Sequence, residues 1–213
     1  MKSPAALHAR EATGGRQMKV AVLCEFSGRV RHAFEENGYD AISFDLLDTE
    51  IPGKHIIGDI TKLGPGYFKK FDLVVAHPPC TDLAVSGARW FKYKQKEQRE
   101  ALDFVRWIMN LPVKHMAIEN PVSIISSHIR KPDQIIQPWQ FGHGETKKTC
   151  LWLKNLPLLT PTDIVGGEIN VSTDLGRAKT DGKNGAVLIL ELLKRWQTSG
   201  ANMFWRKTNE KRD

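Results

Sequence analysis

A cysteine with the properties of a nucleophile ends the apolar run in DLVVAHPPCTDL, residues 72–83. The run is typical of a buried strand, and two prolines fix the backbone that leads to Cys80. Buried cysteines are commonly inert. However, ligands of open α/β sheets bind beyond the carboxyl ends of the strands, and a thiolate placed there is a strong nucleophile. We therefore predict covalent chemistry by Cys80, with Glu119, one strand further along the chain, as an acid or hydrogen-bond partner.

The spacing of the cysteines argues against other uses. His77 precedes Cys80 by three positions, but zinc deaminases need a second cysteine where this chain has Leu83. Cys24, Cys80 and Cys150 are odd in number and far apart, which argues against a disulfide framework and a closed zinc site. We therefore expect no metal, and a reducing cytoplasm as the natural setting.

Polar residues, glycines and one aromatic residue follow the first three predicted strands. These are Phe26, Ser27 and Gly28 after the first strand, Asp45 after the second, and Gly58 and Asp59 after the third. A glycine turn lets the backbone approach a ligand, and an acid after the second strand can accept hydrogen bonds from ribose hydroxyls. The positions together predict a nucleoside-bearing cofactor. FSGRVR is not the dinucleotide fingerprint G-x-G-x-x-G, however, and a simple tight turn explains Gly28 equally well.

The elements that must position these residues alternate along the chain. Short β-rich runs predict strands at 19–24, 39–45, 54–60, 71–77, 114–120 and 149–156. Helices are expected at 27–38, with Ser27 as N-cap, and at 94–111. The alternation predicts an α/β fold with a doubly wound, mostly parallel sheet covered on both faces. Residues 157–184 are expected to be loop, and residues 184–196 a last helix.

Composition indicates a globular domain with a polyanionic partner. The chain has 213 residues, 41% of them hydrophobic, and we expect a domain at 18–196, a disordered extension at 1–17 and a basic tail at 197–213. No run approaches the roughly 18 apolar residues that span a bilayer. The net charge of +7 favours nucleic acid. GARWFKYKQKEQR (87–99) interleaves basic and aromatic residues that can neutralise phosphates, although a solvated helix face explains its individual lysines better.

The motifs FSG, PPC and ENP, in this order and spacing, resemble the DNA cytosine-5 methyltransferase family. AHPPCTDLAVSGARWF and IRKPDQIIQPWQFGHGETKKTCLWLKNLPLL are similar to its small bacterial and phage-encoded branch, which lacks a large target-recognition domain. The resemblance covers residues 18–196. It implies the Rossmann-like fold of S-adenosylmethionine-dependent methyltransferases, DNA as substrate, and the cytoplasm of a bacterium or phage-infected host cell.

The resemblance also implies roles for individual residues. Cys80 attacks C6 of a flipped-out cytosine, Glu119 holds the ring N3 and the exocyclic amino group, and C5 takes the methyl group of S-adenosylmethionine. Pro79 matches the catalytic-loop proline. The residues implied to bind the cofactor are Phe26, Ser27, Gly28, Asp45, Asp59, Ile60, His77 and Pro78. The residues implied to bind the substrate are Asn120, Arg89, Lys147, Lys148 and Thr149.

The chain departs from the family pattern at several points. Val30 stands where the family has a second glycine, and ETKKT replaces an arginine pair, so Lys147, Lys148 and Thr149 are approximate equivalents. Only about two dozen residues separate the sixth predicted strand from the last helix, too few for a recognition domain. We therefore expect low specificity, or a protein partner that supplies it. RNA or a nucleotide remains an alternative substrate.

Two other functions compete with this interpretation. Amino-methyltransferases use a strand-end X-P-P-aromatic motif, but HPPC has neither Asp or Asn first nor an aromatic residue last. A DNA-binding or regulatory module that keeps the fold and cofactor pocket without turnover is the second alternative, favoured by Val30 and the absent arginines.

Overall fold

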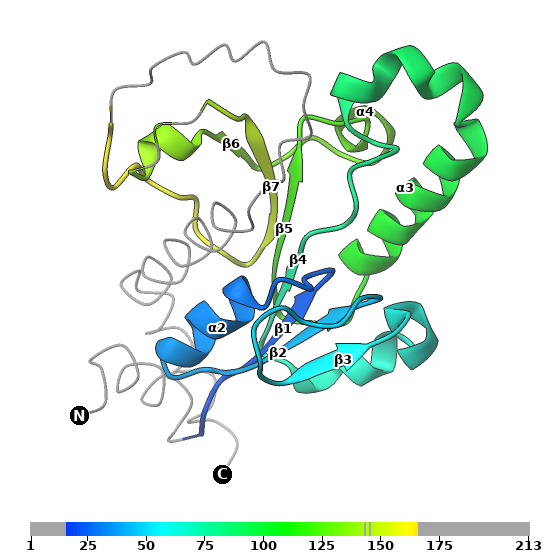
Figure 1. Ribbon diagram of the computed structural model, residues 1–213. Helices are drawn as coiled ribbons and strands as arrows, with labels where there is room; N and C mark the ends of the chain where they lie inside the picture. The colour runs from blue at the N-terminus through cyan, green and yellow to red at the C-terminus, as the bar shows by residue number, and fades with distance from the viewer. Residues whose placement is uncertain (1–15, 143, 145, 166–213) are drawn as a thin grey trace.

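The computed structural model describes residues 16–142, 144 and 146–165 (Figure 1). The predicted helix at 184–196, the basic tail, residues 1–15 of the predicted extension and most of the predicted loop at 157–184 lie outside the described residues. Of that extension, Arg16 and Gln17 are described. Arg16 Nη1 donates to Asp72 Oδ2 at 2.7 Å and Gln17 Nε2 donates to the Gly38 carbonyl at 2.8 Å.

A seven-stranded sheet in the order β3-β2-β1-β4-β5-β7-β6 forms the centre of the fold. Its strands are β1 (Lys19–Leu23), β2 (Asp40–Asp45), β3 (His55–Ile57), β4 (Leu73–Ala76), β5 (His115–Pro121), β6 (Gln134–Ile136) and β7 (Thr149–Lys154). The strands β1 to β5 pair in parallel. The predicted α/β fold with a mostly parallel sheet is therefore confirmed.

The sheet departs from the prediction at the β6 edge. β7 pairs antiparallel with both β5 and β6, so the sheet is mixed, and β6 was not predicted. β6 has only three residues, QII, which is too short to show a period. An apolar run indicates that both faces of a strand are buried, but it does not indicate the direction of the strand. The orientation of β7 could therefore not be predicted from its sequence.

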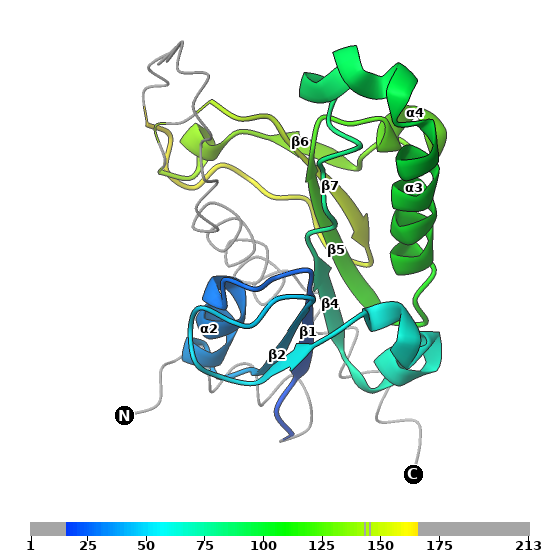
Figure 2. The same ribbon diagram turned by 45° about the vertical axis from the view of Figure 1, so that its right-hand side comes forward.

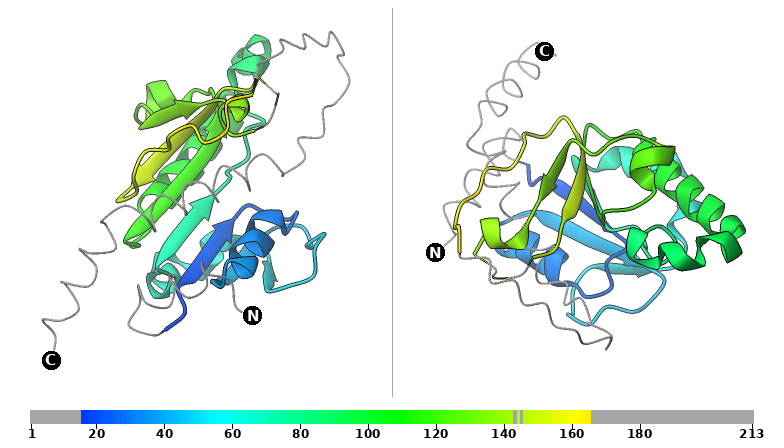
Figure 3. Two further views of the ribbon diagram at one scale, coloured as in Figure 1. Left: turned by 90° about the vertical axis from the view of Figure 1, so that its left-hand side faces the viewer. Right: turned by 90° about the horizontal axis from the view of Figure 1, so that it is seen from above.

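Helices cover both faces of the sheet, as predicted (Figures 2 and 3). The α-helices are α2 (Arg29–Glu36), α3 (Gln95–Met109) and α4 (Ile125–His128), and the 3₁₀ helices are η1 (Ile60–Leu63), η2 (Pro65–Lys70), η3 (Val85–Tyr93) and η4 (Pro138–Gln140). Val30 and Phe34 of α2 pack with Val20, Val22 and Val75 on one face. α3 packs with the alternate strand residues on the other face. No helix in the described part of the chain is long and apolar enough to cross a membrane.

The start of α2 differs from the prediction. Gly28, with φ 73°, is the N-cap, and the helix begins at Arg29 rather than at Ser27. A Cβ on Gly28 would lie 2.8 Å from Thr49 Oγ1 and 2.9 Å from Ile51 Cβ. The left-handed backbone and this close approach explain the glycine without a ligand, so the tight-turn interpretation of Gly28 is sufficient.

Candidate active site

The carboxyl ends of β4 and β5 bring Cys80 close to Glu119. The two strands are parallel neighbours, with Ala76 of β4 in register with Ile118 of β5. Cys80 follows β4 by four residues and is half-buried, and Glu119 lies near the end of β5 and is also half-buried. The negative charge of Glu119 acts on the Cys80 thiol. A potential nucleophile and a potential acid therefore share one edge of the sheet.

Hydrogen bonds from β5 and the segment after it hold the loop that carries Cys80. Asn120 Nδ2 donates to the Pro78 carbonyl at 2.8 Å. The Leu83 amide donates to the Cys80 carbonyl at 3.0 Å, and the Ile124 amide donates to the Leu83 carbonyl at 3.0 Å. Asn120 is only 1% exposed, so its side chain holds the loop from within the protein interior. Pro78 is buried and Pro79 is exposed.

The surroundings of Cys80 shift the pKa of its thiol in opposite directions. Burial and then the carboxylate of Glu119 raise the pKa of the thiol, whereas Lys147 and a backbone hydrogen bond lower it. Lys147 and Lys148 are exposed, while Thr149 is buried and its hydroxyl donates to the Lys147 carbonyl at 3.3 Å. Lys147 therefore supplies positive charge beside the thiol and favours the thiolate form that reacts.

Removing this charge is expected to slow alkylation of Cys80. In Lys147→Ala, the reaction with iodoacetamide at mildly alkaline pH should be about 2- to 5-fold slower, and the difference should shrink at high salt because the lysine is exposed. Peptide mass spectrometry measures the rate at each cysteine. Cys24, whose pKa burial and Asp45 raise to about 12, is the slow internal reference. Lys148→Ala is the matched control, and an equal effect of both variants would contradict a specific action of Lys147.

His77 lies against Glu119 at the end of β4. Its Nδ1 is 3.1 Å from Glu119 Oε2, and both side chains are largely buried. The His77 amide donates to the Leu23 carbonyl at 3.0 Å, which extends the pairing of β4 with β1 beyond the strand. The ring of His77 thus contacts the carboxylate beside Cys80, and its contact with a cofactor stays a prediction.

Glu25, which the sequence analysis did not single out, lies at the end of β1 beside the predicted cofactor residues. It is 6% exposed, and its Oε1 accepts hydrogen bonds from the Ser27 hydroxyl and, at 3.4 Å, from the Val30 amide. Its Oε2 is buried and has no hydrogen-bond partner among the described residues. A buried carboxylate oxygen of this kind is suited to accept a hydrogen bond from a bound ligand.

Exposed apolar side chains surround Asp45 at the end of β2. Asp45 Oδ1 accepts from the Leu47 amide at 3.0 Å. Leu46 is 70% exposed and Leu47 58%, Ile57 is in register with Asp45 on β3 and is 57% exposed, and Phe26 follows β1 at 41% exposed. Large apolar groups beside an acid fit a ligand with a flat ring and a ribose.

Asp59 and Ile60 have structural partners. Asp59 Oδ1 accepts from the Thr61 amide at 2.9 Å and from its hydroxyl at 2.7 Å, and the Thr61 hydrogen bonds lower the pKa of this exposed carboxyl. Ile60 is buried and packs in the core with Phe68 and Phe71. Asp59 thus caps η1, and the side chain of Ile60 serves the core.

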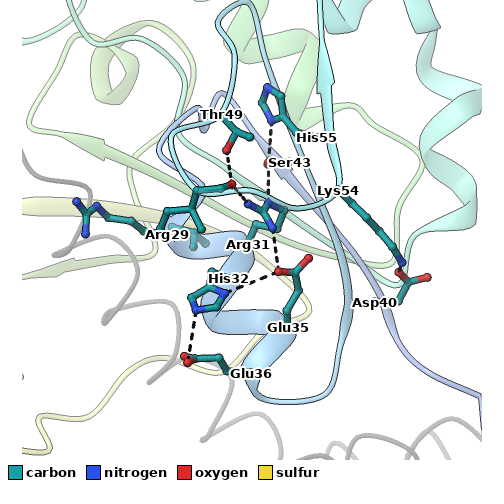
Figure 4. A network of polar contacts seen from close by, with 12 residues as sticks. Arg29, Arg31, His32, Glu35, Glu36, Asp40, Ser43, Thr49, Lys54 and His55 are labelled. Atoms are coloured by element: carbon teal, nitrogen blue, oxygen red, sulfur yellow. Dashed lines mark hydrogen bonds and ion pairs between the residues drawn. The ribbon is translucent and has the colours of Figure 1, made fainter.

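A buried arginine holds the segment between β2 and β3 (Figure 4). Arg31 is fully buried, and its Nε donates to Ser43 Oγ at 3.2 Å, its Nη1 to Glu35 at 2.8 Å and its Nη2 to the Ile51 carbonyl at 2.5 Å. His55 bridges Ser43 Oγ, 2.8 Å from Nδ1, and the Leu47 carbonyl, 2.9 Å from Nε2. The network therefore anchors both ends of the segment that carries the exposed leucines.

The remaining predicted substrate residue, Arg89, lies on the surface in the segment that follows Cys80. Arg89 is exposed on η3, and Lys94 Nζ pairs with Asp82 at 2.7 Å, so this lysine of the basic segment is engaged within the chain. The described residues contain no group of three or more His, Cys, Asp or Glu side chains that could hold a metal ion.

Comparison with known proteins identifies the family. The model of the C-5 cytosine-specific DNA methylase family matches residues 23–138, more than half of the chain, and the match includes both Cys80 and Glu119. A search of curated proteins finds no match. With the α/β fold and the two residues at the carboxyl edge of the sheet, the chain belongs to the C-5 cytosine-specific DNA methylase family.

Proposed function

We propose that this protein is an S-adenosylmethionine-dependent methyltransferase that acts at C5 of cytosine in DNA through a covalent bond between Cys80 and C6 of a flipped-out base. The observation that carries the proposal is the position of Cys80 and Glu119 at the carboxyl ends of adjacent parallel strands. Attack by the thiolate at C6 moves electrons toward N3, and an acid within reach of N3 accepts the resulting charge by giving a proton.

The residues at the ends of β1 and β2 fit S-adenosylmethionine. Glu25 Oε2 would accept from the amino group of its methionine part, and Asp45 would accept from the ribose hydroxyls. Leu46, Leu47 and Phe26 would pack against the adenine ring. When bound, the cofactor supplies an electrophilic methyl group. Pro79 and Asn120 would serve by fixing the direction of Cys80.

The basic residues near Cys80 suit a nucleic-acid substrate. Arg89, Lys147 and Lys148 are exposed and would contact phosphates, whose contribution to affinity is independent of sequence. We assign the chain to the small bacterial or phage-type branch on its long runs around Cys80 and Lys147. A protein partner would supply target specificity, and the three free cysteines suit the cytoplasm.

Transfer of a radiolabelled methyl group tests the function. The full chain is incubated with labelled S-adenosylmethionine and, separately, duplex DNA, single-stranded DNA, RNA or deoxycytidine triphosphate, and the products are digested and separated. We expect label in 5-methyldeoxycytidine from DNA. Label on the exocyclic nitrogen would instead support an amino-methyltransferase. Cofactor binding without transfer to any substrate would contradict the proposal and favour a non-catalytic module.

Asp45→Asn is expected to weaken the binding of S-adenosylmethionine by about 10-fold, because an amide is a weaker acceptor than a carboxylate for the ribose hydroxyls. Isothermal titration calorimetry measures the dissociation constant. Asp48→Asn, three residues further on and exposed, is the matched control, and its affinity should stay within about 2-fold of the unmodified protein. Equal affinities of the two variants for S-adenosylmethionine would show that Asp45 does not bind the cofactor.

A further inference from the structure

We propose that His77 is a positioning residue for Glu119: its ring donates a hydrogen bond from Nδ1 to Glu119 Oε2 and confines the acidic proton of the carboxyl to Oε1, the oxygen that serves the cytosine ring. The proposal rests on the proposed function. The contact is direct, with Nδ1 3.1 Å from Oε2, and both groups lie at the edge where Cys80 is held.

The surroundings of the ring determine which nitrogen carries the proton. His77 Nε2 is buried and has no hydrogen-bond partner among the described residues. A proton on Nε2 would be a buried donor without an acceptor, and a charged ring would have this defect together with the cost of a buried charge. The proton therefore belongs on Nδ1, where the carboxylate oxygen accepts it.

This tautomer determines where Glu119 can carry a proton. If Oε2 were protonated, Nδ1 would have to accept, and the ring proton would move to the unpartnered Nε2. With Nδ1–H facing Oε2, the proton of the neutral carboxyl lies on Oε1, which makes no hydrogen bond within the described part of the chain. Oε1 is thus the oxygen that can donate to a substrate.

The arrangement matches the proton needed in the first step. Cys80 reacts as a thiolate after its proton has left to solvent. As the S–C6 bond forms, the C5=C6 electron pair moves to C4–C5, the C4=N3 pair moves to N3, and N3 takes the proton from Oε1 of Glu119. The carboxylate that remains is stabilised by Nδ1–H of His77, which keeps its proton throughout. When C5 takes the methyl group, the C4=C5 pair forms the new C5–C bond, C4=N3 re-forms and N3 returns its proton to Oε1. A water molecule then takes the C5 proton, the C5–H pair forms C5=C6, and Cys80 leaves as a thiolate.

Two substitutions test the hydrogen bond that His77 donates to Glu119. His77→Asn keeps an N–H close to the place of Nδ1, whereas His77→Leu removes the donor. Single-turnover methyl transfer should fall about 10²-fold in His77→Leu, because the carboxyl is then misplaced. In His77→Asn it should stay within about 10-fold, because the amide N–H still donates to Oε2 and orients the carboxyl. The transfer is measured at saturating S-adenosylmethionine, so that a change in cofactor affinity does not enter the rate.

An unchanged rate in His77→Leu, or an equal loss of rate in His77→Leu and His77→Asn, would overturn the proposal. A readout that does not need activity is ¹⁵N NMR of the imidazole in the unmodified protein, where we expect the neutral Nδ1–H form, and the Nε2–H form would contradict it. If the unmodified protein transfers no methyl group, the proposed function fails, whereas the NMR result still decides whether the contact has this form.

Discussion

Replacing Cys80 by alanine is expected to abolish covalent capture of DNA that contains 5-fluorocytosine and to lower methyl transfer at least about 10³-fold. Fluorine at C5 blocks the elimination step, so an active enzyme stays attached to the base through the sulfur. Alanine cannot form the bond to C6, and no other thiol is placed to replace it. Cys24 is half-buried at the end of β1, and Cys150 lies within β7, 1% exposed. Denaturing gel electrophoresis of the trapped complex gives a direct measurement.

Cys150→Ala is the matched control for this experiment. Cys150 is buried, and Glu119 raises its pKa after burial, so it shares much of the environment of Cys80. The control should form the adduct at nearly the rate of the unmodified protein, and both variants should bind S-adenosylmethionine equally well. An adduct that survives in Cys80→Ala would show that the nucleophile is another residue, and the proposed mechanism would then fail.

Arg31→Met is expected to lower the free energy of unfolding by about 3–5 kcal/mol, because it removes one partner of a buried charged network. Methionine fills much of the same space but donates no hydrogen bond. Ser43, Glu35 and the Ile51 carbonyl would each lose a donor. The segment between β2 and β3 would lose an anchor, so we also expect weaker binding of S-adenosylmethionine. Urea unfolding and calorimetry measure the two effects.

Arg29→Met is the control on the same helix, because Arg29 points away from the network and should change the stability by less than about 0.5 kcal/mol (Figure 4). Gly53→Ala tests the same network from the other side, since a Cβ at Gly53 would overlap the guanidinium of Arg31. Gly66→Ala, where a Cβ would meet nothing within 4 Å, is its neutral counterpart. Similar stability of Arg31→Met and Arg29→Met would refute the anchoring role.

The positions of most strands along the chain, and the sheet edge at which the candidate residues gather, followed from patterns that are local in the sequence. Apolar runs such as 71–77 predict buried strands because both faces of a covered parallel sheet exclude polar residues. Polar residues at the ends of such runs must then gather at one edge. This reasoning placed Cys80 and Glu119 on neighbouring strand ends, as the structure has them.

Contacts between distant segments were not predictable in this way. From the sequence alone, Arg31 would be expected to be a solvated helix residue. Nothing in the adjacent sequence indicates that its guanidinium will contact Ser43 and Ile51. Glu25 was available to sequence reasoning as an acid directly before FSG, but its burial and its free oxygen depend on the start of α2.

By itself, the sequence determined the α/β class, the strand ends and the residue types that gather there, because these depend on periodicity and composition over a few residues. The tertiary structure alone decided that β7 enters antiparallel between β5 and β6, and that the ring of His77 contacts Glu119. Strand direction and side-chain pairing depend on which segments become neighbours. That choice is made by packing and loop closure across the whole chain, not by any one segment.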